Sequence, residues 1–177
     1  FYLEHRQQKI DVFFSGGKRK IFLNEIPKKH PTEVIGKFRA VLFTPIHLSL
    51  VKDGPDNRRR FIDAAMCQIS SAYAKLVAQY NQTLKHRNFL LKGLDTSKSG
   101  EDTLEVWDFK LVELGSKIIR QRLGYLSGLR EKAPKIYHEI SRGREALSVG
   151  YKLSGCESVH GELSEQELRE HFLKALK

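Results

Sequence analysis

The sequence predicts a mainly helical α+β fold in which an antiparallel helical hairpin, a short coiled-coil-like arm, is flanked by β-strands. Three observations support this fold class. The first forty residues contain short runs rich in β-branched and aromatic residues, residues 55–142 space their apolar side chains as helices do, and residues 164–177 form a further amphipathic stretch. A helical region inserted into a strand-containing region would give this order.

The strand signals come first along the chain. Two β-prone runs, Lys9–Phe14 and Arg19–Asn24, are separated by Gly16-Gly17, a pair typical of a tight hairpin turn. One helical turn is expected within 32–37. A short apolar strand over 38–43 should then end at Thr44-Pro45, because proline cannot donate a hydrogen bond to a sheet. A second strand-like run, 144–155, follows the helices.

Helical spacing begins at Pro55, which suits the first position of a helix, and Asp56 in the first turn complements the helix dipole. A second helix is expected over 70–92 and a third over 104–140, with a polar loop at 93–102 between them. Their matching apolar stripes predict that the two long helices pair antiparallel as a hairpin.

Two local signals refine the helices. Pro134 lies inside the third helix and is expected to kink it near its end. Ser164 precedes the last amphipathic stretch and Glu167 follows three residues later, the spacing of a capping box.

Basic residues outnumber acidic ones, which gives a formal net charge of +10. The surplus lies towards the start, where residues 1–60 carry 13 basic and 6 acidic side chains. Such a surplus favours polyanions, because each neutralised phosphate releases a counterion. Simple solubility explains the same charge, so composition alone leaves nucleic-acid binding an even choice.

Signatures of catalysis and of metal binding are missing. The run "SGGKRK" lacks the spacing of a phosphate-binding loop, and the seven histidines are too scattered for a zinc site. Cys67 and Cys156 are isolated, which favours a reducing, cytoplasmic compartment. No apolar run approaches membrane-spanning length. The chain alone is therefore expected to be non-enzymatic, with no catalytic residue, cofactor or metal.

Three blocks of sequence resemble the RecF family, the bacterial recombination-mediator ATPases of the SMC/ABC class. They are "AVLFTPIHLSLVKDGPDNRRRFID" at 40–63, "YNQTLKHRNFLLK" at 80–92 and "WDFKLVELGSKIIRQR" at 107–122. The family typically has Phe-x-Pro-Glu-Asp-Leu, Lys-Gly and Pro-x-x-Arg-Arg-x-x-Leu-Asp in the first block, Lys-Gln-Arg-Asn-x-Leu-Leu in the second and Trp-Asp at the start of the third. The blocks occur in the family's order, and the resemblance spans nearly the whole chain.

The resemblance implies a division into three parts: 1–43 as the end of the ATPase lobe (lobe I), 44–142 as the helical lobe II, and 143–177 as the return towards lobe I. It also implies that the chain is a piece of a longer protein. A Walker A loop would precede Phe1, and the ABC signature and Walker B carboxylates would follow Lys177.

In ABC-type ATPases, a linker called the Q-loop leads from the nucleotide-binding lobe into the helical lobe. The resemblance places Thr44–Lys52 there, with Thr44, Pro45 and His47 as the nucleotide-linked residues. This chain has Ile46-His47 where the family usually has Glu-Asp. An acidic role in the linker therefore does not carry over.

For the intact protein, the resemblance implies weak DNA-dependent ATPase activity with ATP and Mg, ATP-dependent homodimerisation, and DNA binding at single-strand gaps. It implies RecR and RecO as partners and no membrane association. The alternative is a non-enzymatic helical protein-interaction module with incidental basic charge. Clustering of Lys and Arg on one face would favour DNA, and an even scatter would favour the alternative.

Candidate site residues fall into two groups. The DNA-binding candidates are basic residues of the hairpin, the first helix and the arm: Lys18, Arg19, Lys20, Lys52, Arg58, Arg59, Lys85, Lys117, Arg120 and Arg122. The structural-junction candidates are Arg60, Asp63 and Arg87. Asp63 is expected to be at least partly buried and to hold one arginine of the triplet, with Arg60 in local reach. Arg87 lies in an apolar seam and must reach solvent or find a partner inside the hairpin.

We expect that this chain neither binds nor hydrolyses ATP appreciably, because it lacks groups that cradle phosphates and hold a metal. Isothermal titration calorimetry with ATP and Mg²⁺ checks this. Micromolar affinity for the 177-residue chain would contradict it.

Overall fold

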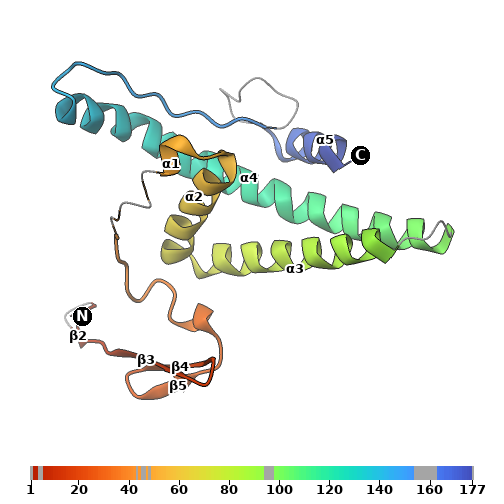
Figure 1. Cartoon of the computed structure of the whole chain (residues 1–177), viewed down its shortest axis with the longest axis horizontal. Coiled ribbons are helices and arrows are strands. Elements are labelled where there is room, and N and C mark those ends of the chain that lie inside the picture. The colour runs from red at the N-terminus through yellow and green to blue at the C-terminus, as the bar shows by residue number, and fades with distance from the viewer. Residues whose placement is uncertain are drawn as a thin grey trace. The chain divides into compact units, whose positions relative to one another are not determined.

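A computed structural model describes residues 2–3, 6–42, 44, 47, 49–93, 98–153 and 163–176. The chain divides into two compact units, Phe1–Lys75 and Leu76–Lys177 (Figure 1). The three-part division at 43/44 and 142/143 remains a prediction for the intact protein. The fold class is confirmed: a small antiparallel sheet accompanies a mainly helical chain.

Short antiparallel strands open the first unit. Their bounds are β1 Tyr2–Leu3, β2 Arg6–Gln7, β3 Ile10–Ser15, β4 Lys18–Leu23 and β5 Ile26–Lys28. β1 pairs with β2, and the other three form a sheet in the order β3-β4-β5. Gly16 and Gly17 both have positive φ, 55° and 73°, which explains the glycine pair in the predicted hairpin turn. The hairpin is confirmed, and β5 is an additional strand.

Helices complete the first unit. A 3₁₀ turn, η1, covers Pro31–Glu33 within the region of the predicted turn. A four-residue helix, α1 (Ser49–Lys52), is followed by α2 (Pro55–Ile69), which has Pro55 in its first turn as expected. α1 was not predicted, because four residues are too few to show a period.

The strand expected over 38–43 is wrong for its described part, because residues 38–42 have no regular structure. The backbone N–H of Ala40 donates to the side-chain oxygen of Gln68 on α2, at 2.9 Å, instead of to a strand neighbour. Phe38, Val41 and Leu42 remain exposed. An apolar run becomes a strand only where an edge is available to pair with it.

Three helices build the second unit. They are α3 (Ser71–Gly93), whose first five residues belong to the first unit, α4 (Lys98–Ile140) and α5 (Glu165–Leu176). α3 and α4 run antiparallel, as predicted, and α5 packs along α4 (Figure 1). α4 begins at Lys98, inside the predicted loop 93–102, of which 94–97 lie outside the described residues. α4 runs through Pro134 without interruption, and the kink there stays a prediction.

The core of the second unit lies along the middle of α4, whereas Ile136 and Ile140, at the end of the expected apolar stripe, are exposed. Leu111, Leu126 and Leu168 are almost fully buried. Further buried apolar side chains are Val112, Leu114, Ile118, Ile119, Tyr151 and Leu153. Leu168 comes from α5, so the helix packs its apolar face against α4 as its amphipathic pattern predicts.

The return strand expected over 144–155 is also wrong for its described part. Only Tyr151 has an isolated bridge, and residues 145–150 have no regular structure. Side chains of α4 hold this run instead. Arg130 donates to the Val149 carbonyl at 3.0 Å, and Arg122 donates to the Tyr151 hydroxyl at 3.2 Å. The first of these bonds satisfies a backbone carbonyl that strand pairing would otherwise use.

The capping box at the start of α5 is confirmed. The backbone N–H of Glu167 donates to Ser164 Oγ at 3.2 Å, and the backbone N–H of Ser164 donates to Glu167 Oε2 at 2.8 Å. Hydrogen bonds from the Ser164 side chain and then its backbone lower the pKa of Glu167. This contribution to stability is therefore present at neutral pH and is lost as acid protonates the carboxylate.

Gly115 is expected to be required where α4 meets α5. A Cβ at this position would lie 2.4 Å from the ring of Phe172, whereas at Gly128, also inside α4, it would meet nothing within 4 Å. Both Gly115→Ala and Gly128→Ala gain helix propensity, so their difference reports the clash. Gly115→Ala should be less stable than Gly128→Ala by about 1–3 kcal/mol in urea unfolding. Equal stability would show that α5 does not pack this closely.

Candidate nucleic-acid interface

The basic residues of the hairpin are exposed but do not share one surface. Lys18, Arg19 and Lys20 make no ion pair with any residue that the structure describes. Side chains alternate along a strand, so Lys18 and Lys20 lie on one face of the sheet and Arg19 on the other. The register places Phe13 opposite Lys20 and Phe14 opposite Arg19. The expected single surface is therefore split between two faces.

Arg58 and Arg59, both DNA-binding candidates, have partners within the chain. Arg58 donates to the backbone carbonyls of Leu50 and Asp53, at 2.9 and 3.1 Å, and so closes the C-terminal end of α1. Arg59 pairs with Asp56, and this hydrogen bond lowers the pKa of the carboxyl. Arg60 is exposed and has no hydrogen bond or ion pair to a described residue. Arg60 therefore joins the candidates for contact with phosphate.

Asp63 lies at the corner between α2 and α3. Its carboxylate, half-buried, accepts a hydrogen bond of 2.6 Å from the hydroxyl of Tyr73, a side chain with no exposed surface. The local pair expected with Arg60 is not formed, and the tyrosine replaces it. Ser70 breaks the helix between them, and its Oγ accepts from the Tyr73 backbone N–H at 3.2 Å. These bonds fix the turn from α2 into α3.

Arg87 finds a partner inside the helical hairpin. Its guanidinium pairs with Asp108 on α4 and donates to the Leu176 carbonyl at the end of α5, at 3.4 Å. The side chains of Arg87 and Asp108 are only 13% and 22% exposed. Beside this pair, the ring of His86 stacks on that of Trp107 with 5.0 Å between centroids. The contacts of Arg87 are structural.

The linker forms a tight turn that the histidine closes. The backbone N–H of Thr44 donates to His47 Nδ1 at 3.0 Å, and the backbone N–H of His47 donates to the Thr44 carbonyl at 2.9 Å. The ring of His47 also packs edge-on against Phe61 of α2. A carboxylate three residues after Thr44 would accept the same N–H. Thus His47 supplies the acceptor without the negative charge, while Pro45 and Ile46 lie outside the described residues.

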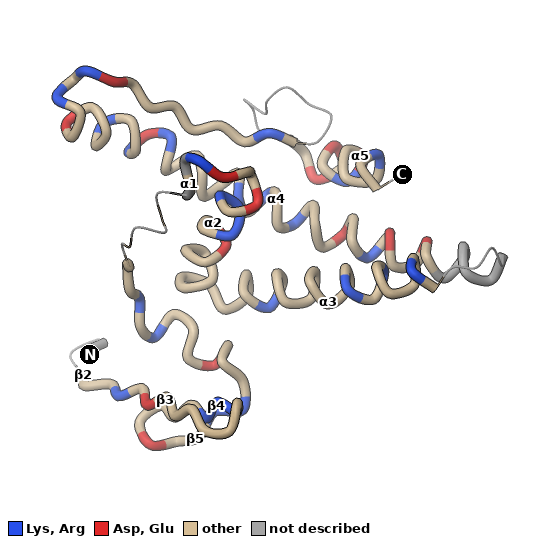
Figure 2. The backbone as a smooth tube through the Cα atoms, in the orientation of Figure 1, with Lys and Arg blue, Asp and Glu red and all other residues tan. Residues whose placement is uncertain are grey.

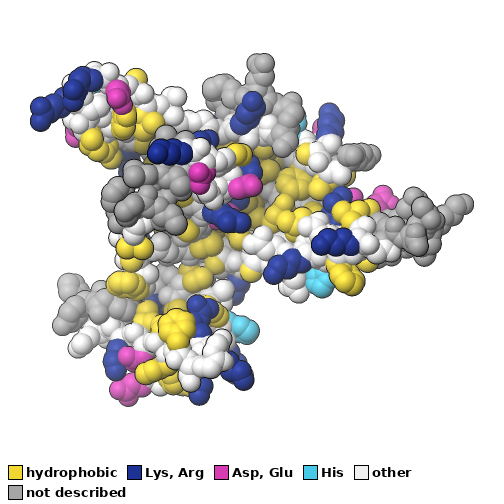
Figure 3. Space-filling model, in the orientation of Figure 1, with side chains coloured by type: hydrophobic (Ala, Val, Ile, Leu, Met, Phe, Trp, Pro, Cys, Tyr) yellow, Lys and Arg dark blue, Asp and Glu magenta, His cyan; other side chains and the backbone are white. Residues whose placement is uncertain are grey.

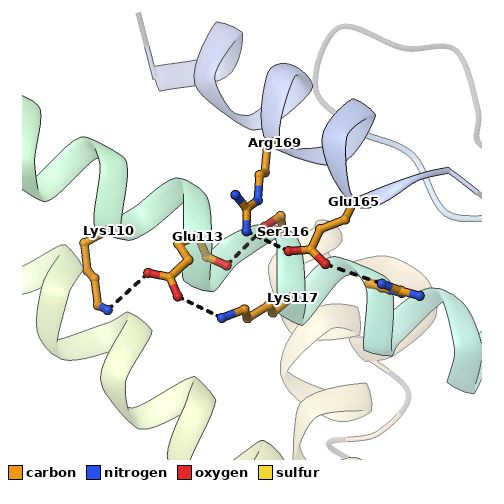
Figure 4. A network of polar contacts seen from close by, with 7 residues as sticks. Lys110, Glu113, Ser116, Lys117, Glu165 and Arg169 are labelled. Carbon is orange, nitrogen blue, oxygen red and sulfur yellow. Dashed lines mark hydrogen bonds and ion pairs between the residues drawn. The ribbon is translucent and has the colours of Figure 1, made fainter.

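The basic residues of the arm are mostly engaged by neighbours (Figure 4). Lys117 pairs with Glu113 at 2.8 Å, and hydrogen bonds from Lys117 and then Lys110 lower the pKa of Glu113. Arg120 pairs with Glu165 of α5 at 3.4 Å. Both basic and acidic residues lie along α4 (Figure 2).

Two further DNA-binding candidates are exposed. Lys85 on α3 and Lys52 at the end of α1 form no ion pair with a described residue. Arg122, by contrast, is held by Tyr151. Of the candidates and the arginine triplet, the basic residues without such a partner are therefore Lys18, Arg19, Lys20, Lys52, Arg60 and Lys85.

One of these features could have been read from the sequence, and another could not. Strand alternation from Gly16-Gly17 places Phe13 on the same face as Lys18 and Lys20. The exposure of Arg60 has no such signal in the sequence.

Within the described ranges, no group of three His, Cys, Asp or Glu side chains could hold a metal ion. None of the described helices combines the length and the apolar composition that a membrane span requires.

Known proteins resemble the chain closely, although no family model matches it. It is 36% identical over 171 residues to the DNA replication and repair protein RecF of Acetivibrio thermocellus, which covers 96% of this chain and 46% of that protein. The RecF of Halothermothrix orenii is 36% identical over 172 residues, 96% of this chain and 45% of the relative.

Solved structures agree. A structure of "the recombination mediator protein RecF-ATPrS in RecFOR pathway" superposes with a TM-score of 0.83 and 34% identity, over 98% of this chain and 46% of that one. A second, of RecF-ATP in the same pathway, gives 0.82 and 35% over 96% of this chain and 44% of that one. The chain is therefore similar to RecF proteins over nearly its whole length. It spans somewhat less than half the length of the RecF relatives that it matches.

Two of the RecF-like blocks meet in the structure. The block 80–92 supplies Arg87, and the block 107–122 supplies Asp108, so the ion pair joins them. The stacked rings of His86 and Trp107 come from the same two blocks. The RecF pattern in these blocks thus includes the contacts between α3 and α4.

Removing the Tyr73 hydroxyl is expected to destabilise the α2–α3 corner. Tyr73→Phe deletes the hydrogen bond to a charged carboxylate and little else, so it should cost about 1.5–3 kcal/mol in urea unfolding. Tyr125→Phe is the matched control, because the structure gives the Tyr125 hydroxyl no bond to a described residue. The control should change stability by less than about 0.5 kcal/mol. Equal effects of the two variants would contradict the role of the Asp63–Tyr73 bond.

Proposed function

We propose that the chain is part of a RecF-type DNA-binding protein of recombinational DNA repair and replication restart, which acts at single-strand gaps as an ATP-dependent dimer. One observation carries the DNA-binding part: the first unit exposes basic side chains that no described acid neutralises. They include Lys18, Arg19, Lys20, Lys52 and Arg60. Such side chains can replace the counterions of phosphates, so they provide affinity for a polyanion.

The nucleotide belongs to the rest of the longer protein in this proposal. The described residues do not fit an ATP–Mg site: Gly16-Gly17 close a β-turn instead of cradling phosphates, and no acidic cluster could hold the metal. The RecF-ATP structures support ATP binding by the intact protein, and the "RecFOR pathway" named for them supports RecR and RecO as partners. In ABC-type ATPases, the Q-loop connects the nucleotide-binding lobe to the helical lobe. By resemblance, the turn at Thr44 and His47 would belong to that connection in the intact protein.

A second function is favoured for the arm by its charge pairing. Lys110 and Lys117 share the carboxylate of Glu113, and Arg120 shares Glu165 with Arg169, so a phosphate would have to compete with these acids for the cations. The arm also exposes large apolar side chains, among them Phe89 and Phe109. These features suit contact with a protein better than contact with phosphate. In this proposal, the arm is a protein-interaction module and the first unit contacts DNA.

The DNA-binding proposal is tested with a gapped duplex at 50 and 200 mM salt. Replacing Lys18, Lys20, Lys52 and Arg60 together by glutamine should weaken binding and lower the slope of log K against log salt by about 0.9 for each phosphate that is no longer neutralised. The control is Lys110→Gln with Lys117→Gln, which removes paired charges from the arm and should leave both quantities nearly unchanged. A greater loss of affinity in the control would move the interface to the arm.

A further inference from the structure

The two faces of the β3–β4 hairpin differ in chemistry. Strand alternation and register assign six side chains to each face. One face, called the lysine face here, consists of Asp11, Phe13, Ser15, Lys18, Lys20 and Phe22. The opposite, apolar face consists of Ile10, Val12, Phe14, Arg19, Ile21 and Leu23.

The apolar face is the side of this sheet that is built to be covered. Five of its six side chains are apolar, and Ile21 at its centre is already buried. An antiparallel sheet commonly packs its apolar face and leaves the other to water. Phe14, 78% exposed here, is therefore an ordinary residue on a face that packs. By the same reasoning, we expect the lysine face to be the one that stays in solvent.

Phe13 is unusual on such a solvent face. Its side chain is 58% exposed, and its ring makes an edge-to-face contact with Phe22, with 5.7 Å between centroids. The contact holds the ring in a defined orientation without covering it. Hydrophobic and basic side chains gather side by side over this sheet (Figure 3).

The charge around Phe13 is positive. Lys20 lies directly across from it, and Lys18 follows on the same face, about 6.6 Å further along β4 at 3.3 Å per residue. Neither ammonium group pairs with a described acid. Asp11 is the acid on this face, and Lys9 neutralises it at 3.2 Å. The lysine face thus presents an oriented aromatic ring beside two unpaired cations.

We infer that the lysine face binds single-stranded nucleic acid, with a base stacked on Phe13 and backbone phosphates held by Lys18 and Lys20. An aromatic ring and adjacent cations are the combination that single strands bind, because their bases are free to stack. A duplex keeps its bases stacked inside and offers Phe13 nothing. This inference rests on the proposed DNA-binding function and assigns it a strand type and a surface.

The test measures binding of the 177-residue chain to fluorescent oligo(dT) and to a plain duplex. Phe13→Leu keeps the apolar bulk and removes the ring, so affinity for oligo(dT) should fall at least about 5-fold, while duplex binding stays within 2-fold. Phe13→Trp should restore the affinity, and the fluorescence of the new indole should be quenched by the oligonucleotide. Phe14→Leu, on the apolar face, is the matched control and should bind oligo(dT) as the wild type does.

A second variant tests the cations independently. Lys18→Gln with Lys20→Gln changes two exposed side chains, and circular dichroism checks that the fold is retained. It should lower the salt slope of oligo(dT) binding by about 1.4, at 0.7 for each phosphate of a single strand. Arg19→Gln should change the slope less.

The outcomes separate this inference from the proposed function. If Phe13→Leu and the double lysine variant bind oligo(dT) as the wild type does, while the wild type binds the gapped duplex, the inference is wrong and the proposed function stands. Equal losses of affinity in Phe13→Leu and Phe14→Leu also overturn it, because the effect would not belong to the lysine face. If the wild-type chain binds no nucleic acid, both fail.

Discussion

The second unit depends on one half-buried ion pair. Arg87 on α3 meets Asp108 on α4, and the same guanidinium reaches the last turn of α5 through the Leu176 carbonyl. Desolvating two charges offsets much of their attraction, so the pair adds less to stability than its burial suggests. Its larger effect is on register. Sliding α3 along α4 by one turn would leave a guanidinium in an apolar seam without its carboxylate, and such a stranded charge costs about 3–5 kcal/mol.

The register fixed by this pair decides what the remaining side chains can do. With Arg87 opposite Asp108, the apolar stripe of α4 buries Leu111 and Leu126, and Gly115 leaves room for the ring of Phe172 from α5. The acids of α4 and α5 then lie within reach of the lysines and arginines of the arm. The pair of Arg120 with Glu165 is therefore a consequence of helix packing. Lys110 and Lys117, by contrast, pair with Glu113 at i,i+3 and i,i+4 spacing within α4, which the sequence itself contains.

Local signals predicted most of the fold, and tertiary contacts decided the rest. Gly16-Gly17 predicted the hairpin turn, and helical spacing predicted α2 to α5. Ser164 with Glu167 predicted the start of α5. Each of these signals acts within a few residues of the chain. The two strands that failed, at 38–42 and 145–150, needed an edge to pair with. Side chains of α2 and α4 bind their backbones instead. The contacts of Arg58 could not be predicted for a similar reason, since the Leu50 carbonyl that orients it comes from another helix.

Net charge is therefore a poor guide to where a polyanion would bind on this chain. Counterion release requires cations that are free to replace ions on the phosphates. Lys117 and Arg120 already have carboxylate partners, and a phosphate would have to displace them. Lys18 and Lys20 have no such competitor among the described residues, and their strand holds them at a fixed spacing. Two unpaired lysines beside an oriented ring are thus better suited to a nucleic acid than the longer row of basic residues along the arm.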